Sequence, residues 1–168
     1  MNMHRAVFPI VAVSCLLASV PALGAPRGTV NIQYVQPSKF TDFSIYGRDY
    51  QWSASYFSTQ ISDDLAPVLE RKVPGGKLTL TFTDIDLAGH YRGRGGSDVR
   101  IVRGEIRPAR MSFAFLLQDS AGRTLANGTT RITDNSSQSS LAHHPRRSTP
   151  LYYEKRMLER WLKSSKTS

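Results

Sequence analysis

Two aspartates stand one residue apart in the segment "TDID", where Asp84 and Asp86 follow a run of alternating apolar residues and threonines. The chain continues with His90 and, after a glycine-rich bend, Asp98. Carboxylate oxygens and imidazole nitrogens bind divalent cations, and an i,i+2 spacing places two side chains on one side of a strand. Two carboxylates at a set distance could instead serve a hydrolase. These residue types therefore allow a metal site, a hydrolytic site or a structural corner.

The surroundings of these acids favour the structural interpretation. The calcium-loop pattern, with its glycine and distal glutamate, is absent from this segment. Nearby arginines would also repel a cation. We therefore expect no metal and no cofactor, and we expect the carboxylates to accept hydrogen bonds from loop amides or arginines. The alternative is a carboxylate-dependent hydrolase or a divalent-metal-binding protein that uses the TDID segment.

The arginines indicate a second kind of chemistry. The "RGRGG" bend offers exposed amides and cations suited to an anion. The 168-residue chain has 22 Lys and Arg against 13 Asp and Glu, a net charge of +9, and such a surface attracts polyanions. As partner we expect an anionic envelope component, such as lipopolysaccharide or an acidic glycan, rather than nucleic acid. The predicted anion-binding face comprises Arg92, Arg94, Arg100 and Arg103, extended by Arg107 and Arg110.

The amino-terminal sequence is typical of a secretory signal peptide. A short cationic piece ends at Arg5, an apolar run extends from Ala6 to Val20, and the small-residue segment "PALGAP" follows. Residues 1–25 are therefore predicted to be a signal peptide, and the mature protein is expected in the periplasm or outside the cell. Since a spanning helix needs roughly 20 apolar residues, we expect no transmembrane segment after cleavage. The single cysteine lies in the apolar run, so the mature domain would fold without disulfides.

Residues 26–168 are predicted to form a single α+β domain. Alternation over residues 30–34 predicts a first strand. Apolar residues then recur at intervals of four, which predicts a helix with one buried face. Pro67 lies inside this pattern, so we expect a kink or break there on the solvent side. The apolar positions of the helix are Phe57, Ile61, Leu65 and Leu69.

The next strand changes phase at the TDID segment. Asp84 and Asp86 continue the parity of its apolar face, so a regular strand would bury two carboxylates at a cost of several kcal/mol. Either a bulge near Thr83 resets the register, or the strand ends there. The apolar positions before it are Leu78, Leu80 and Phe82.

The remaining sequence predicts a meander and a terminal helix. "DVRIVR" is a short strand, the segment 111–117 alternates clearly, and "DSAGR" is a hairpin turn with Gly122 at positive φ. Residues 124–134 return with a bulge expected at Gly128, and residues 134–149 are predicted to be a flexible serine-rich loop. Thr149 is expected to cap a helix with Pro150 at its first position.

The predicted fold is thus an antiparallel meander of about five strands, with one long helix after the first strand and a carboxy-terminal helix packed on the sheet. Several segments together resemble the DUF3016 family, a bacterial exported domain of unknown function: "VNIQYVQPSKFTDF", "LTFTDIDLAG", "DVRIVRGEIRPARMSF", "DSAGRTL" and "LYYEKRMLERWL". The resemblance implies a secreted or periplasmic protein and implies no activity, cofactor or partner. We expect a non-catalytic binding or scaffolding module of the envelope, and the sequence leaves its oligomeric state open.

Overall fold

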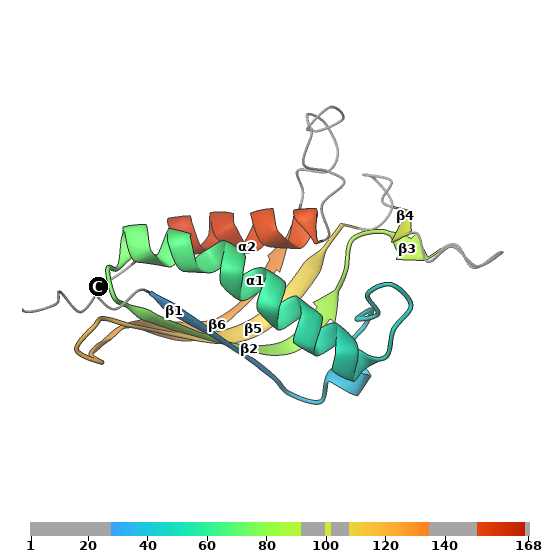
Figure 1. Cartoon of the computed structure of the whole chain (residues 1–168), viewed down its shortest axis with the longest axis horizontal. Coiled ribbons are helices and arrows are strands. Elements are labelled where there is room, and N and C mark those ends of the chain that lie inside the picture. Colours follow the sequence, from blue (N-terminus) through green and yellow to red (C-terminus); the bar gives the residue numbers. More distant parts are fainter. Residues whose placement is uncertain (1–27, 92–99, 102–107, 135–150, 167–168) are drawn as a thin grey trace, which may run out of the picture.

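The computed structural model describes residues 28–91, 100–101, 108–134 and 151–166. These residues form a four-stranded mixed sheet in the order β1-β2-β5-β6, a separate two-stranded pair β3-β4, and two helices on one face of the larger sheet (Figure 1). This confirms the predicted α+β class, the helix after the first strand and the terminal helix packed on the sheet. Within the described ranges, neither helix combines the length and the apolar character needed to cross a membrane.

The first two strands are parallel. β1 (Thr29–Tyr34) leads through a short 3-10 turn to α1 (Tyr50–Lys72), and β2 (Lys77–Asp86) then pairs with β1 from Thr29↔Lys77 to Tyr34↔Phe82. A helix of 23 residues carries the chain back to the end at which β1 began, so β2 runs in the same direction as β1. The predicted all-antiparallel sheet of about five strands is therefore wrong at this pair, and the main sheet has four strands.

α1 begins and continues for identifiable reasons. The carboxylate of Asp49, at its N-cap, accepts a 2.9 Å hydrogen bond from the amide of Trp52. The helix is not broken at Pro67 but continues to Lys72. Pro67 lies on the exposed side, as predicted, where the carbonyl of Asp63 that loses its amide partner can bond to water instead.

β5 (Arg110–Gln118) and β6 (Thr124–Thr133) form the predicted hairpin on the far side of β2. Gly122 has the predicted positive φ, +80°. The expected bulge is present, but its position differs from the prediction. Because Gln118 pairs with Thr124 and Leu117 with Ala126, the extra residue is the one between those two partners, Leu125, whereas Gly128 stays in register opposite Phe115.

The remaining predicted strand is reduced to a small pair. β3 (His90–Tyr91) and β4 (Arg100–Ile101) pair with each other and do not join the main sheet. The predicted strand "DVRIVR" therefore contributes two described strand residues outside the meander. The predicted signal peptide lies outside the described residues, as does all of the serine-rich segment except Asp134.

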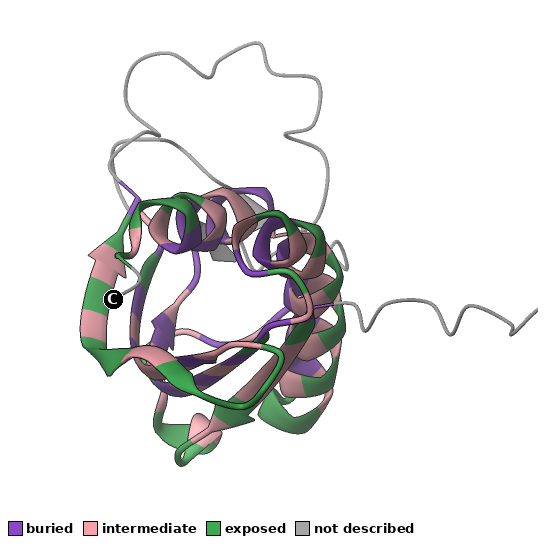
Figure 2. Ribbon diagram, turned by 90° about the vertical axis from the view of Figure 1, so that its left-hand side faces the viewer, coloured by how far each residue is buried: buried purple, intermediate pink, exposed green. Residues whose placement is uncertain are grey.

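The core lies between the sheet and the two helices (Figure 2). α2 (Tyr152–Ser164) starts later than predicted, because Leu151 rather than Thr149 occupies its N-cap. Its Trp161 ring packs edge-on against Phe113 at 4.8 Å between centroids, which fixes α2 over β5. The largest side chains with less than 2% exposure are Phe57, Ile61, Leu65, Leu69, Leu78, Leu80, Phe82, Ile85, Leu87, Met111, Phe113 and Leu117.

Lys72 joins the ends of the two helices. Its Nζ donates to the carbonyl oxygen of Leu162 at 2.7 Å and to the carbonyl and hydroxyl of Ser165. These acceptors belong to the last turn of α2, whose carbonyl groups have no partner within the helix. A cation there also interacts favourably with the helix dipole. One side chain of α1 therefore caps α2.

Candidate functional site

The TDID segment contains the predicted bulge. The pairing of β2 with β5 shifts register between Phe82 and Asp84, so that Thr83 has no partner residue of its own. The shift returns the following apolar residues, Ile85 and Leu87, to the core, where both are at most 1% exposed. Asp84 is thereby placed opposite Ser112 instead of entering the core with Phe82.

Asp84 holds the loop that follows β1. Its Oδ1 accepts a 2.8 Å hydrogen bond from the amide of Thr41, and its Oδ2 accepts a 3.0 Å hydrogen bond from the hydroxyl of the same residue. One residue further, Asp42 forms an isolated parallel bridge with Asp86. The Asp42 amide donates to the carbonyl of Ile85 at 3.0 Å, and its carbonyl accepts from Leu87 at 3.1 Å. The end of β2 therefore fastens residues 41–42 through side chains and backbone together.

Asp86 lies near one of the predicted arginines. The distance from its Oδ2 to Nη1 of Arg110 is 3.9 Å, a loose ion pair across the start of β5. His90 and Arg100 are placed on the facing strands β3 and β4, where His90 pairs with Ile101 and Tyr91 with Arg100. The other predicted site residues lie outside the described residues: Arg92, Arg94, Asp98, Arg103 and Arg107.

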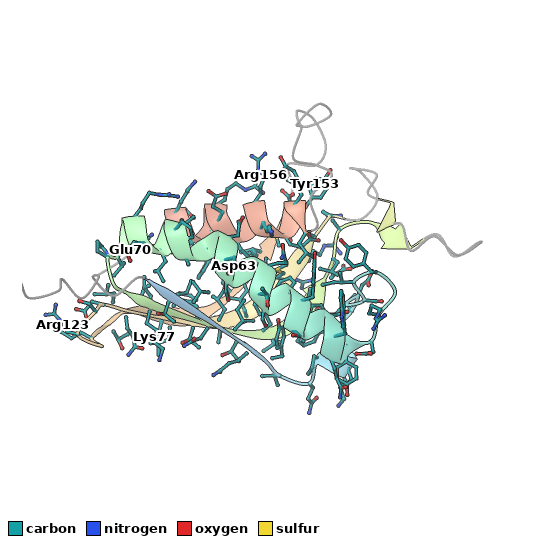
Figure 3. The ribbon with its side chains drawn as sticks, viewed as in Figure 1. Asp63, Glu70, Lys77, Arg123, Tyr153 and Arg156 are labelled. Atoms are coloured by element: carbon teal, nitrogen blue, oxygen red, sulfur yellow. The ribbon has the colours of Figure 1, made fainter. Side chains whose placement is uncertain are left out.

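Among the described residues, no cluster of three or more histidines, cysteines, aspartates or glutamates is arranged to hold a metal ion. The carboxylates instead serve backbone amides. Oε2 of Glu70 accepts from the amide of Gly28 at 2.6 Å and from that of Gly75 at 3.0 Å, which joins the end of α1 to the start of β1 (Figure 3). Oε1 of Glu154, which is 3% exposed, accepts from the amide of Ala88 at 2.8 Å.

Asp119 follows the same pattern in the β5–β6 turn. Its Oδ1 accepts from the amides of Ala121 and Arg123, each at 2.9 Å, and its Oδ2 accepts from Nε of Arg123 at 2.7 Å. These hydrogen bonds from Arg123 lower the pKa of the Asp119 carboxyl below its ordinary value. Asp84, Glu70, Glu154 and Asp119 are thus each engaged in hydrogen bonds that join segments of the domain.

Several cations, in contrast, lie toward solvent along α2. Arg160 is 44% exposed although its Nη2 lies 2.5 Å from Oδ1 of the buried Asp134. Arg156 stacks over the Tyr152 ring at 5.6 Å and projects from α2 away from the sheet (Figure 3). Lys163, which is exposed although its Nζ lies 2.6 Å from Oε1 of Glu159, is in the last turn of the helix, and the exposed Lys166 follows it.

Trp52 and Tyr56 lie at the start of α1, pack against the margin of the core and form an aromatic cluster with Tyr46 that was not predicted from the sequence. Their rings stack at 5.0 Å, and Tyr46, 41% exposed, contacts both edge-on. The guanidinium of Arg48 lies 5.4 Å from the Trp52 ring centroid. Burial and the hydrogen bond with Tyr46 raise the pKa of Tyr56 to about 12. The signal in the sequence was the recurrence of aromatic residues in "YGRDYQWSASY".

A groove runs between β1 and α1 on the side of the domain away from α2. It has a volume of about 590 Å³. The strand contributes residues 30–33, and the helix contributes Ser58, Thr59, Ser62 and Asp63. β1 is the outermost strand of the sheet here, so the groove lies along a sheet edge.

Fold and contacts together define a small α+β domain in which several carboxylates accept hydrogen bonds from the backbone of distant segments. Residues 28–164 match the family described as "Protein of unknown function (DUF3016)", so the chain belongs to the DUF3016 family. A search of curated proteins finds none that matches the chain.

Proposed function

We propose that this DUF3016 protein is an exported, non-catalytic envelope protein that binds an anionic partner such as lipopolysaccharide or an acidic glycan. The observation that carries the proposal is the unequal use of charge. Carboxylates such as Asp84, Glu70 and Glu154 accept hydrogen bonds from backbone amides of distant segments. Arginines and lysines are in excess, and many of them extend into solvent. A polyanion would therefore meet mainly cations on approach.

The proposed contact surface combines described and sequence-predicted residues. Arg110 is exposed at the start of β5. Arg100 belongs to β4, the strand that precedes β5 in the sequence. Arg92, Arg94 and Arg103 are included as sequence predictions and lie outside the described residues. Flexible anionic polymers bind such arginines through many weak contacts, each of which is screened by salt.

The test is retention of the mature protein on immobilised heparin and on lipopolysaccharide at low salt. We expect retention that is lost as the salt concentration rises, because the contacts are between exposed charges. Arg100→Gln combined with Arg110→Gln should elute at lower salt than the unchanged protein. Lys77→Gln combined with Arg71→Gln removes the same charge from exposed positions elsewhere and should shift elution less. No retention at low salt, or equal shifts in both variants, would contradict the proposal.

Export is tested separately. Amino-terminal sequencing of the protein from an envelope fraction should give a first residue near Ala25, since "PALGAP" contains the expected cleavage site. An intact amino terminus in the cytosol would contradict this part of the proposal and would leave the anion-binding test unaffected.

A further inference from the structure

We propose that the free edge of β1 binds an extended, cationic peptide segment of a partner protein, which adds a strand to the sheet and places a lysine or arginine beside Asp63. This inference does not depend on the proposed function. It rests on three observations: the orientation of the backbone groups of β1, the composition of the edge, and the charge in the groove.

The backbone of β1 alternates between its two sides. The amide of Thr29 donates to Gly76 at 2.8 Å and that of Val35 donates to Phe82 at 2.9 Å, so odd-numbered residues bond to β2. Even-numbered residues must then direct their N–H and C=O groups to the opposite side. The hydroxyl of Ser62 donates to the carbonyl of Val30 at 3.2 Å, which confirms this orientation at one end.

Ile32 and Tyr34 therefore present amides and carbonyls at the open edge. Within the described part of the chain, the hydrogen bonds of this edge include none to the backbone of these two residues. Backbone groups of this kind are a template for another strand, and proteins usually protect such edges with charged side chains, proline or bulges. The β1 sequence "TVNIQY" has neither a charged residue nor a proline, and its pairing with β2 is without a register shift.

The groove beside the edge has space for the side chains of an added strand. It measures about 590 Å³ and is lined mostly by hydroxyl and amide side chains with Val30 and Ile32 between them. Among its lining residues Asp63 alone is charged, and it is exposed on α1 facing outward (Figure 3). An extended peptide here would gain main-chain hydrogen bonds for affinity and an ion pair for register, as in strand addition to a sheet edge.

The charge of Asp63 indicates which partner fits the groove. A second copy of the chain would present its own β1, which has no cation to meet Asp63. A peptide that alternates apolar and small polar residues, with one lysine or arginine, would form hydrogen bonds with the edge, place side chains in the groove and pair with the carboxylate of Asp63.

The experiment follows single backbone amides by hydrogen exchange in NMR spectra of the mature protein. In the free protein, the amides of Ile32 and Tyr34 should exchange much faster than those of Asn31 and Gln33, which bond to β2. The probe is an acetylated, amidated octapeptide of alternating valine and threonine with one central lysine. This peptide should slow exchange at Ile32 and Tyr34. The same peptide with its backbone amides N-methylated should bind at least tenfold more weakly, since it loses several hydrogen bonds.

Asp63→Asn should weaken binding of the lysine peptide about two- to fivefold, the range for an exposed ion pair, and leave the affinity for a peptide with threonine in place of lysine unchanged. Glu159→Gln, which removes an exposed-face carboxylate of α2, is the matched control and should change neither affinity. Three results would each overturn the proposal: no slowing of exchange by the peptide, slow exchange at Ile32 in the free monomer, or a dimer in which Ile32 is protected without peptide.

Discussion

Asp84 and Thr41, 43 residues apart in the chain, are joined by two hydrogen bonds, one to the amide and one to the hydroxyl of the threonine. Both carboxylate oxygens are used. The pair therefore connects the end of β2 to the loop between β1 and α1 in the way that an N-cap aspartate connects to a helix.

The first prediction concerns this pair. Asp84→Ala should lower the free energy of unfolding by about 1–3 kcal/mol, because hydrogen bonds to a charged acceptor are lost. The measurement is urea denaturation of the mature protein, with Asp63→Ala as a control that removes an exposed carboxylate outside this pair. Unchanged stability in Asp84→Ala, together with loss of a calcium- or zinc-induced stabilisation, would favour a metal site over the structural interpretation.

A second prediction concerns the buried Glu154. Its Oε1 accepts a hydrogen bond from the amide of Ala88 at 2.8 Å. Because Glu154→Ala removes this acceptor from a buried donor, it should lower the free energy of unfolding by about 2 kcal/mol. Glu154→Gln keeps a carbonyl oxygen at the same position and should recover most of that loss. The check is the midpoint of urea unfolding at constant slope. Equal loss in both variants would mean that the negative charge, and not the hydrogen bond to Ala88, stabilises this position.

Capping of α2 by Lys72 gives a third prediction. Lys72→Met keeps the apolar stem but removes the donor to Leu162 and Ser165, and should cost about 1 kcal/mol. Amide exchange in the last turn of α2 should accelerate more than exchange in β2, because the end of the helix is released first. Arg71→Met, at the exposed neighbouring position, should do neither.

The β5–β6 turn provides a prediction about pH. The pKa of Asp119 is lowered in the folded protein, chiefly by its hydrogen bonds with Arg123. A carboxyl with a lowered folded pKa stabilises the fold above its unfolded pKa, and this contribution disappears as the pH falls through the folded value. Asp119→Ala should therefore lower the melting temperature at pH 7, with a difference that shrinks below the ordinary pKa of 3.8. A difference that stays constant into strong acid would show that the turn geometry alone is responsible.

The features that could be predicted from the sequence are those encoded within a few residues. The parity change at Asp84 required a bulge or an end of the strand, and the structure has the bulge. The hairpin turn with Gly122 was also predicted correctly, because turn chemistry is local. The contacts that give these positions their roles are not local. Nothing near Asp84 in the sequence identifies Thr41 as its partner. The alternation of apolar and polar residues in β1 also does not indicate whether the adjacent strand, β2, runs parallel or antiparallel to it.

Other differences arise from competition between local preference and packing. Pro67 lacks an amide, but the apolar face that continues to Leu69 keeps α1 in one piece. The bulge predicted in β6 is present, but at Leu125 instead of Gly128, because the sequence alone does not determine which residue of the strand is the extra one. The aromatic cluster around Trp52 was missed because a helical apolar pattern does not distinguish a buried ring from one at the margin of the core.

The parallel pairing of β1 with β2 also affects the order in which the chain can fold. Partners such as Gln33 and Thr81 are 48 residues apart, whereas β5 and β6 are joined by a tight turn. Closing the longer loop costs more entropy, so the β5–β6 hairpin should form early and β1 should be added late. During synthesis, the first strand and α1 are complete before any residue of β2 exists. Until the strands of the sheet are made, the apolar face of α1 has no sheet to cover, and apolar surface exposed in this way favours aggregation.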